Sequence, residues 1–256
     1  MAIPCQSPGV GLLPPLFPIR DRLPTRLFPF VNYTLIAANI AVFFVQITDA
    51  MNHGMRGGLE PGVWALVPAR FSSDPVFAFE TVFTSMFLHA SWSHVLGNMF
   101  FLWIFGDNVE DAMGHFRYLV FYLLGGVCAA AAQTLANPAS TIPMVGASGA
   151  ISAVLAAYGF LYPRSPITVF NPIFLLWFFF GLFLHLPAWL VIGEYFLVNL
   201  SDALMNSEQG GVAFMAHVGG FVGGAFLLRL FMAGRVRMDD YARWQRLADR
   251  REQSIW

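Results

Sequence analysis

The amino-acid sequence predicts an all-α membrane protein: a bundle of six transmembrane helices in which the fourth helix is short and begins inside the membrane. Three observations lead to this prediction. The chain of 256 residues is 57% hydrophobic and only 11% charged, whereas a soluble domain carries about 25% charged residues. Apolar runs of membrane-spanning length recur along the chain. The arginine residues fall mostly in the two tails that flank these runs.

Six apolar runs approach the roughly 20 residues that a membrane-spanning helix requires, and Ile167–Leu184 is a seventh candidate. With six spans and the N-terminus inside, every arginine except Arg56 and Arg70 lies on the inner side. A seventh span would move Arg229 and all later arginines outside. Because inner loops are enriched in arginine, we expect six spans, with Ile167–Leu184 along the inner interface. The expected helices are Val31–Thr48, Phe83–Phe105, Phe116–Leu135, Ala147–Tyr162, Leu186–Leu204 and Val212–Met232.

We expect three parts along the chain: a cytoplasmic N-terminal tail at 1–30, the six-helix membrane domain at 31–232, and an Arg-rich cytoplasmic C-terminal tail at 233–256. The C-terminal tail is expected to contact anionic lipid. A net charge of −1 offers no broad basic surface, so we expect no nucleic-acid partner. Cys5 and Cys128 lie far apart and lack the spacing of a zinc site, so neither a disulfide nor a metal is expected.

The fourth expected helix carries a serine at its head, in the string Met144–Ser152 (MVGASGAIS). From Ser148 to Tyr162 this helix would be about 22 Å long, which is shorter than the roughly 30 Å hydrocarbon core. If Tyr162 marks the inner interface, Ser148 lies below the outer surface. A helix that begins there leaves free backbone N–H groups, which attract negative charge. A serine alone is more commonly a small packing residue.

A histidine in the sixth expected helix offers this serine a partner. Ionisable residues are costly inside a membrane and indicate function by default. His217 lies at a depth similar to that of Ser148, on a helical stripe with Gly220 and Gly224. Small residues at this spacing let membrane helices approach closely. Because neutral imidazole is the usual base that activates a serine, we expect Ser148 and His217 to form a hydrogen bond. The alternative is that His217 only bonds a neighbouring carbonyl.

The second expected helix carries His94 and Asn98, which lie four residues apart and therefore on one face. Both side chains can donate hydrogen bonds to a developing oxyanion, as acyl transfer requires. The alternative is that they only hold neighbouring helices together.

A third group would normally orient a catalytic histidine. No Asp or Glu occurs between Asp111 and Glu194, so we expect a Ser–His dyad. Glu194 and Glu208 stay open as orienting groups.

Three motifs in this order resemble the rhomboid family of intramembrane serine proteases. They are HxxxN from His94 to Asn98, GxSG from Gly146 to Gly149, and AHxxG from Ala216 to Gly220. Flanking segments look similar too, and the resemblance extends from about Pro18 to Met232.

The resemblance implies an intramembrane serine endopeptidase with no cofactor, whose substrates are single-pass transmembrane proteins. It also implies a multi-pass protein of the bacterial inner membrane. Ser148 would be the nucleophile and His217 the general base, then acid. The oxyanion hole would be formed by His94, Asn98 and the backbone at Gly146 and Ala147. Gly146 would also let the loop bend towards the site.

Two positions depart from the family pattern. Several members carry an aromatic residue four positions after the serine, where this chain has Ser152. The stretch Gly193–Asn199 stands where relatives often have Trp and Gln.

Two other functions stay open at this point. A transporter or proton relay would use Glu194, Asp202 and His217 as its ionisable chain. A non-catalytic membrane adaptor would bind single-span clients through the same groove. A zinc protease is not expected, because the sequence has no HExxH motif.

Overall fold

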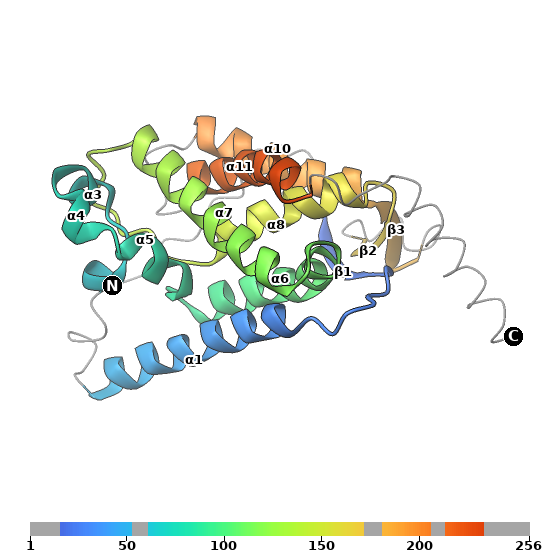
Figure 1. The fold of residues 1–256 in the computed structure, drawn as a ribbon, viewed down its shortest axis with the longest axis horizontal. Helices are drawn as coiled ribbons and strands as arrows, with labels where there is room; N and C mark the ends of the chain where they lie inside the picture. The colour runs from blue at the N-terminus through green and yellow to red at the C-terminus, as the bar shows by residue number, and fades with distance from the viewer. Residues whose placement is uncertain (1–15, 53–60, 172–180, 206–212, 233–256) are drawn as a thin grey trace, which may run out of the picture.

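The computed structural model describes residues 16–52, 61–171, 181–205 and 213–232. Within these residues the protein is mostly helical, as predicted, and its long helices form a bundle (Figure 1). The long helices are α1 (Phe30–Asn52), α6 (Trp92–Met113), α7 (His115–Ala136), α8 (Ser148–Leu161), α10 (Ala188–Met205) and α11 (Phe214–Phe231).

Short helices occupy one end of the bundle and a small sheet the other end (Figure 1). The short helices are α2 (Pro61–Trp64), α3 (Pro68–Ser73), α4 (Pro75–Ala78), α5 (Thr81–Thr84) and the 3₁₀ helix η1 (Ser85–Phe87). The strands are β1 (Phe17–Asp21), β2 (Pro166–Phe170) and β3 (Phe183–Pro187), which pair antiparallel in the order β1-β2-β3. The prediction of an all-α fold was therefore wrong at this end of the molecule.

The apolar run Ile167–Leu184, which was expected to lie along the inner interface, contributes two strands to this sheet. The described parts of Ile167–Leu184 lie mostly in β2 and β3, and residues 172–180 lie outside the described part. Ile167 and Val169 are fully buried, while the residues at the two ends of β2 are exposed. Successive side chains of a strand point to opposite faces, so this strand covers the end of the helix bundle with one apolar face.

Helix α8 lies at the centre of the bundle and is short. Every residue from Gly149 to Tyr158 is buried, and α6, α7, α10 and α11 all contact this helix. Its 14 residues span about 21 Å at a rise of roughly 1.5 Å per residue. A helix of this length ends before it crosses a hydrocarbon core of about 30 Å. The short fourth helix is thus present at the predicted position.

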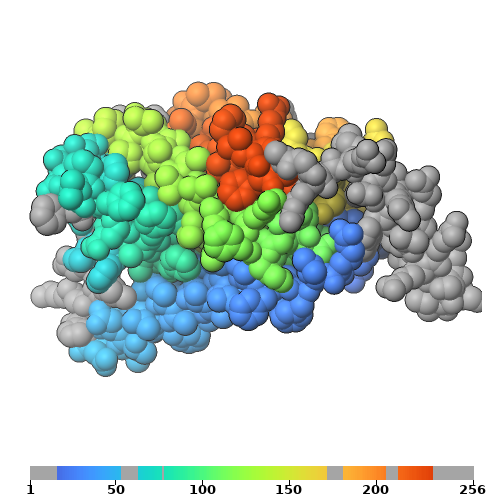
Figure 2. Space-filling view, viewed as in Figure 1, coloured from blue at the N-terminus to red at the C-terminus, as the bar shows by residue number. Residues whose placement is uncertain are grey.

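Four helices, α1, α7, α10 and α11, are long and apolar enough to cross a membrane. Helix α8 is apolar but shorter, and α6 has the required length but carries polar residues such as Asn98 and Asp107. Figure 2 shows α1 along one long side of the molecule, where exposed Phe44 and Val45 suit contact with lipid. The protein is an integral membrane protein, and the count of six spans stays a prediction.

Helix α6 begins later than predicted, at Trp92 rather than Phe83. The earlier residues form α5 and η1, and the chain then becomes extended. The Ser91 hydroxyl accepts a hydrogen bond from the His94 N–H at 3.2 Å and so caps the new helix. This cap places His94 in the first turn of α6.

A buried carboxylate fixes the start of α1 against the end of α6. Glu110 is fully buried and accepts hydrogen bonds from the backbone N–H groups of Val31 and Asn32 at 2.9 and 2.7 Å. His115 Nδ1 also contacts this carboxylate. Because the first N–H groups of a helix have no partner within it, Glu110 satisfies donors that would otherwise be buried without a bond.

Asp21 connects the sheet to the helices. Its Oδ2 accepts hydrogen bonds from Asn108 Nδ2 at 2.7 Å and from the Tyr158 hydroxyl at 2.9 Å. Burial, together with the nearby Asp107 carboxylate, raises the pKa of Asp21 from 3.8 to about 7. The folded protein therefore holds this proton more tightly than the unfolded chain does.

We expect the substitution Asp21→Asn to reduce the pH dependence of stability. Because the folded pKa is raised, the contribution of Asp21 is most favourable below the unfolded pKa of 3.8 and declines as the pH rises to about 7. The neutral amide lacks this loss. The Tm of the wild type minus the Tm of the variant, both measured in detergent, should decrease from pH 5 to pH 8. Parallel Tm curves over this range would show that the prediction is wrong.

Candidate active site

Ser148 is the first residue of α8 and follows a loop that depends on a glycine. Gly146 has φ +122°, a backbone conformation that favours glycine, as expected of a residue that bends the loop. The Gly146 N–H donates to the Ser85 carbonyl at 2.9 Å, and the Met144 N–H donates to the Leu66 carbonyl at 2.7 Å. These two bonds hold the loop against the short helices and so fix the position of Ser148.

Helix α11 lies close to α8 because two of its glycines, Gly220 and Gly224, face that helix. A Cβ atom on Gly220 would overlap the carbonyl of Gly149, and one on Gly224 would lie 2.5 Å from the Cα of Ala153. The predicted stripe of small residues is therefore the contact surface. One turn before Gly220, the Nε2 atom of His217 lies 2.8 Å from the Ser148 hydroxyl. The predicted hydrogen bond is present.

The other ring nitrogen of His217 contacts an amide rather than a carboxylate. His217 Nδ1 lies 2.5 Å from Asn199 Oδ1. Only Asp and Glu were considered as groups that could orient His217, and Asn199 was therefore not predicted from the sequence. The available signal was a buried polar residue in an apolar helix, since such residues commonly have a specific partner inside a membrane.

The aromatic residue that the sequence lacks at position 152 is supplied by α10. The Ser152 hydroxyl donates to the Ser148 carbonyl at 2.8 Å and lies 2.9 Å from the Tyr195 hydroxyl. Because a carbonyl only accepts hydrogen bonds, the single hydroxyl proton of Ser152 is donated to the Ser148 carbonyl. The Tyr195 hydroxyl must therefore be the donor in its bond to Ser152. The Tyr195 ring centroid lies 6.5 Å from that of His217. Tyr195 therefore packs beside the imidazole.

His94 and Asn98 face the loop that precedes Ser148. A Cβ atom on Gly146 would lie 2.7 Å from His94 Nε2 and 3.5 Å from Asn98 Nδ2. Asn98 Nδ2 is buried and has no hydrogen-bond partner among the described residues. Ala147, the other backbone position expected here, is fully buried. The site thus holds a buried donor that is ready to bond a ligand atom.

The carboxylates considered as orienting groups do not take that place in the described structure. Glu194 accepts a hydrogen bond from the Leu16 N–H at 3.3 Å, whereas His217 Nδ1 contacts Asn199. Glu208 lies outside the described residues. No three His, Cys, Asp or Glu side chains within the described ranges come together in a way that could hold a metal ion.

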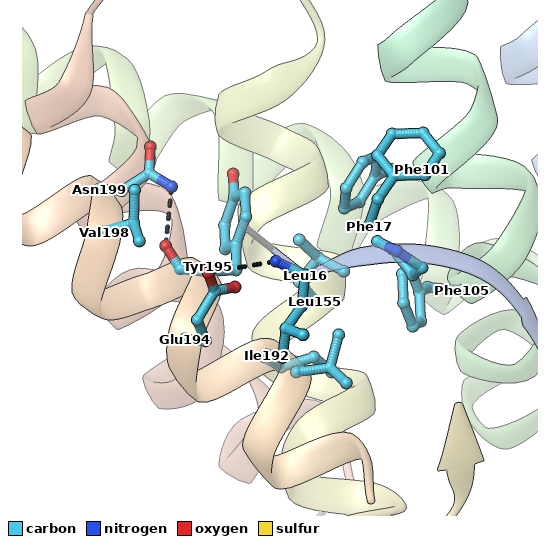
Figure 3. A pocket seen from close by; sticks show the side chains of 12 residues that line it. Leu16, Phe17, Phe101, Phe105, Leu155, Ile192, Glu194, Tyr195, Val198 and Asn199 are labelled. Carbon is cyan, nitrogen blue, oxygen red and sulfur yellow. Dashed lines mark hydrogen bonds between the residues drawn. The ribbon is translucent and has the colours of Figure 1, made fainter. Parts of the chain in front are cut away.

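A cavity of about 200 Å³ lies between α6, α8, α10 and β1 (Figure 3). Its walls are mostly apolar, with Phe101 and Phe105 on the α6 side and Glu194 on the α10 side. Tyr195 and Asn199 line this cavity and also contact Ser152 and His217. The cavity therefore adjoins the Ser148–His217 pair from the side of the bundle.

A sequence model of the rhomboid domain matches residues 77–234, which is more than half of the chain and includes Ser148, His217 and Asn199. The chain belongs to the rhomboid family. The family membership that the three motifs indicated is confirmed.

The chain is similar to rhomboid proteins from plants, parasites and bacteria. It is 42% identical over 73 residues to Rhomboid-like protein 11, chloroplastic, of Arabidopsis thaliana, and the aligned residues make up 28% of this chain and 26% of that protein. It is 32% identical over 169 residues to Rhomboid-like protease 5 of Toxoplasma gondii, 64% of this chain and 17% of that protein. It is 29% identical over 214 residues to Rhomboid protease AarA of Providencia stuartii, 77% of this chain and 70% of that protein. The chain thus spans about a quarter or less of the first two relatives.

Proposed function

We propose that this rhomboid protein is an intramembrane serine endopeptidase that cleaves transmembrane segments of other membrane proteins. The observation that carries the proposal is the distance of 2.8 Å between His217 Nε2 and the Ser148 hydroxyl. A serine becomes a nucleophile when a base lies within hydrogen-bond reach. Two of the similar proteins are named as proteases, which also supports this function.

Ser148 and His217 perform the two proton transfers of acylation. The Ser148 oxygen attacks the carbonyl carbon of the scissile peptide bond while His217 Nε2 takes the hydroxyl proton. His217 then donates this proton to the leaving amine, and the C–N bond breaks. The products are an acyl-enzyme, in which the amino-terminal part of the substrate is esterified to Ser148, and a released carboxyl-terminal fragment with a new free amine.

Donors around Ser148 stabilise the negative charge that develops on the substrate oxygen. Asn98 Nδ2 is the strongest candidate, because it is buried and lacks a partner among the described residues. His94 and the backbone N–H groups at Ala147 and the start of α8 supply further donors. The Gly146 N–H, which was also expected here, is instead bonded to the Ser85 carbonyl at 2.9 Å. Donors that are already in place need no reorganisation when the charge appears.

Water completes the reaction by hydrolysing the acyl-enzyme. Ser148 and His217 are both only half-buried, so the end of α8 that carries them is accessible from outside the bundle. His217 takes a proton from this water as the water oxygen attacks the ester carbon. The ester C–O bond then breaks, His217 returns the proton to the Ser148 oxygen, and the acyl fragment leaves with a new carboxyl group. The free enzyme is restored.

The substrate class follows from the position of the site. Ser148 begins a helix that is too short to cross the bilayer, and the adjoining cavity between α6 and α10 is mostly apolar. A transmembrane segment that unwinds locally would fit this side of the bundle. Single-pass membrane proteins are the proposed substrates.

The proposed topology follows the arginine pattern of the sequence. We place the sheet and the residues 1–30 and 233–256 on the cytoplasmic side, with 31–232 as the six-helix membrane domain. The similarity to the Providencia stuartii protease over 77% of this chain supports a bacterial cell membrane as the location.

The proposal is tested by labelling the purified protein in detergent with a fluorophosphonate probe. The activated Ser148 oxygen should attack the phosphorus atom and release fluoride, which leaves a fluorescent adduct on the wild type. Ser148→Ala should abolish the adduct, whereas Ser201→Ala, which changes an exposed serine on α10, should retain it. If the folded wild type gives no adduct, or if Ser148→Ala gives the same adduct, the proposed function is wrong.

A further inference from the structure

A buried amide on α10 makes two hydrogen bonds next to the catalytic pair. Asn199 Nδ2 donates to the carbonyl of Tyr195 at 2.8 Å, and Asn199 Oδ1 contacts His217 Nδ1 at 2.5 Å. Asn199 is only 9% exposed, so water has little access to either bond. Its two polar ends therefore have different and defined partners.

These two bonds determine which nitrogen of His217 carries the proton. A backbone carbonyl only accepts hydrogen bonds, so the NH₂ group of Asn199 must face Tyr195 and its oxygen must face His217. The amide oxygen also only accepts, so Nδ1 of His217 must be protonated. A neutral imidazole has one N–H group, and Nε2 therefore presents its lone pair to the Ser148 hydroxyl.

We propose that Asn199 is the positioning residue of the site, which selects the tautomer of His217 that can act as a base. This inference rests on the proposed function, because a base is needed only if Ser148 is a nucleophile. In this arrangement, which we call the relay, a chain of hydrogen bonds between uncharged groups runs from the Tyr195 carbonyl through Asn199 and His217 to Ser148. Asn199 takes the place that a carboxylate occupies in a Ser–His–Asp triad.

The opposite tautomer is disfavoured at both ends of the imidazole. With the proton on Nε2, an N–H group would face the Ser148 hydroxyl and no base would be available. At the other end, the lone pair of Nδ1 would face the lone pairs of Asn199 Oδ1. After proton transfer from Ser148, the Nδ1–H bond to Asn199 becomes charge-assisted and strengthens.

The relay needs α10 to stay at a fixed distance from α8 and α11. The Tyr195 hydroxyl reaches Ser152 of α8 at 2.9 Å, and Tyr195 also supplies the carbonyl that Asn199 bonds. Phe196, the next residue, packs against Phe221 of α11 with ring centroids 4.6 Å apart. These contacts hold the Asn199 oxygen in line with His217 Nδ1.

The test compares the rate of fluorophosphonate labelling, as a function of pH, in two variants of nearly the same size. Asn199→Leu removes both hydrogen bonds and should slow labelling by about 10- to 100-fold. This is less than the roughly 10²- to 10⁴-fold that general-base catalysis supplies, because His217 itself is retained. Asn199→Asp keeps an acceptor but adds a charge that favours imidazolium. It should keep labelling active and move the midpoint of the pH–rate profile to higher pH.

Asn39→Leu is the matched control. Asn39 is also buried in a helix, and its amide donates to the Leu35 carbonyl four residues earlier at 2.8 Å, which is the bond that Asn199 makes within α10. This variant should keep the wild-type pH midpoint, since it lies on α1. Comparison of Tm values separates a loss of folding from a loss of the base.

The outcomes distinguish the inference from the proposed function. A folded wild type that is not labelled, or a labelled Ser148→Ala variant, overturns the proposed function and the inference with it. A labelled wild type with an Asn199→Leu variant that reacts at the same rate overturns the inference alone. If Asn199→Leu does not fold, Asn199→Asp decides: a raised pH midpoint supports the positioning role, and an unchanged midpoint overturns it.

Discussion

The double substitution Ser148→Ala with His217→Ala is expected to lower peptide-bond cleavage no further than either single substitution. Each single substitution should reduce the rate by at least ~10⁴-fold, because a nucleophile and its base act as one unit. The distance of 2.8 Å between the two side chains supports this coupling. The measurement is the initial rate of cleavage of a single-span substrate that is reconstituted with each variant in liposomes.

His185→Ala provides the control for this experiment. His185 lies in β3, where its Nε2 contacts Arg22 at 2.7 Å, in the sheet at the end of the bundle opposite the short helices (Figure 1). Its loss removes an imidazole without touching Ser148 and should leave cleavage close to the wild-type rate. Losses from Ser148→Ala and His217→Ala that multiply in the double variant would mean that the two residues act independently, and the proposed mechanism would fail.

Gly220→Ala is expected to separate α11 from α8 and to inactivate the protein. The added Cβ would overlap the backbone carbonyl of Gly149, which cannot rotate away as a side chain can. Overpacking of this kind costs about 1–3 kcal/mol or more, which corresponds to a fall in Tm of roughly 2–4 °C for each kcal/mol in a chain of this size. Because His217 lies one turn away, labelling of Ser148 should fall with the Tm.

Gly193→Ala makes the same chemical change at a helical glycine of α10 where a Cβ would meet no atom within 4 Å. It should leave the Tm unchanged or raise it slightly, since alanine is favoured over glycine within a helix by up to about 1 kcal/mol. Thermal unfolding in detergent and fluorophosphonate labelling measure both effects. Equal Tm values for Gly220→Ala and the wild type would contradict the close contact between α8 and α11.

The sequence was sufficient to predict the parts of the fold that the bilayer constrains. A membrane requires long apolar helices, so α1, α7 and α11 begin and end within a few residues of the predicted bounds. The short helix at Ser148 and the close packing around His217 could also be predicted, because helices that pack closely inside a membrane carry small residues at a regular spacing. Together these features predicted that Ser148 and His217 would meet.

The features that the sequence did not predict depend on contacts between distant segments. Strand β1 pairs with β2, almost 150 residues later, and neither five-residue strand has an apolar pattern that stands out from its surroundings. The start of α6 is set by the Ser91 cap rather than by the apolar run that begins earlier. Asn199 was not predicted as the partner of His217, because only charged residues were considered for that position. Its position on α10 lets its side-chain oxygen bond His217.

An amide at position 199 lowers the free-energy cost of inserting α10 into the bilayer. A newly made helix meets lipid before its neighbours cover it, and a carboxylate near the helix centre costs about 2.5–3.5 kcal/mol at that step. Helix α10 is the least apolar of the four long apolar helices, and it already carries Glu194 and Asp202. With Asn199, the chain assembles its site without a third charge in this helix. In the proposed mechanism, charge separation then arises only during turnover, in a bundle that has already formed.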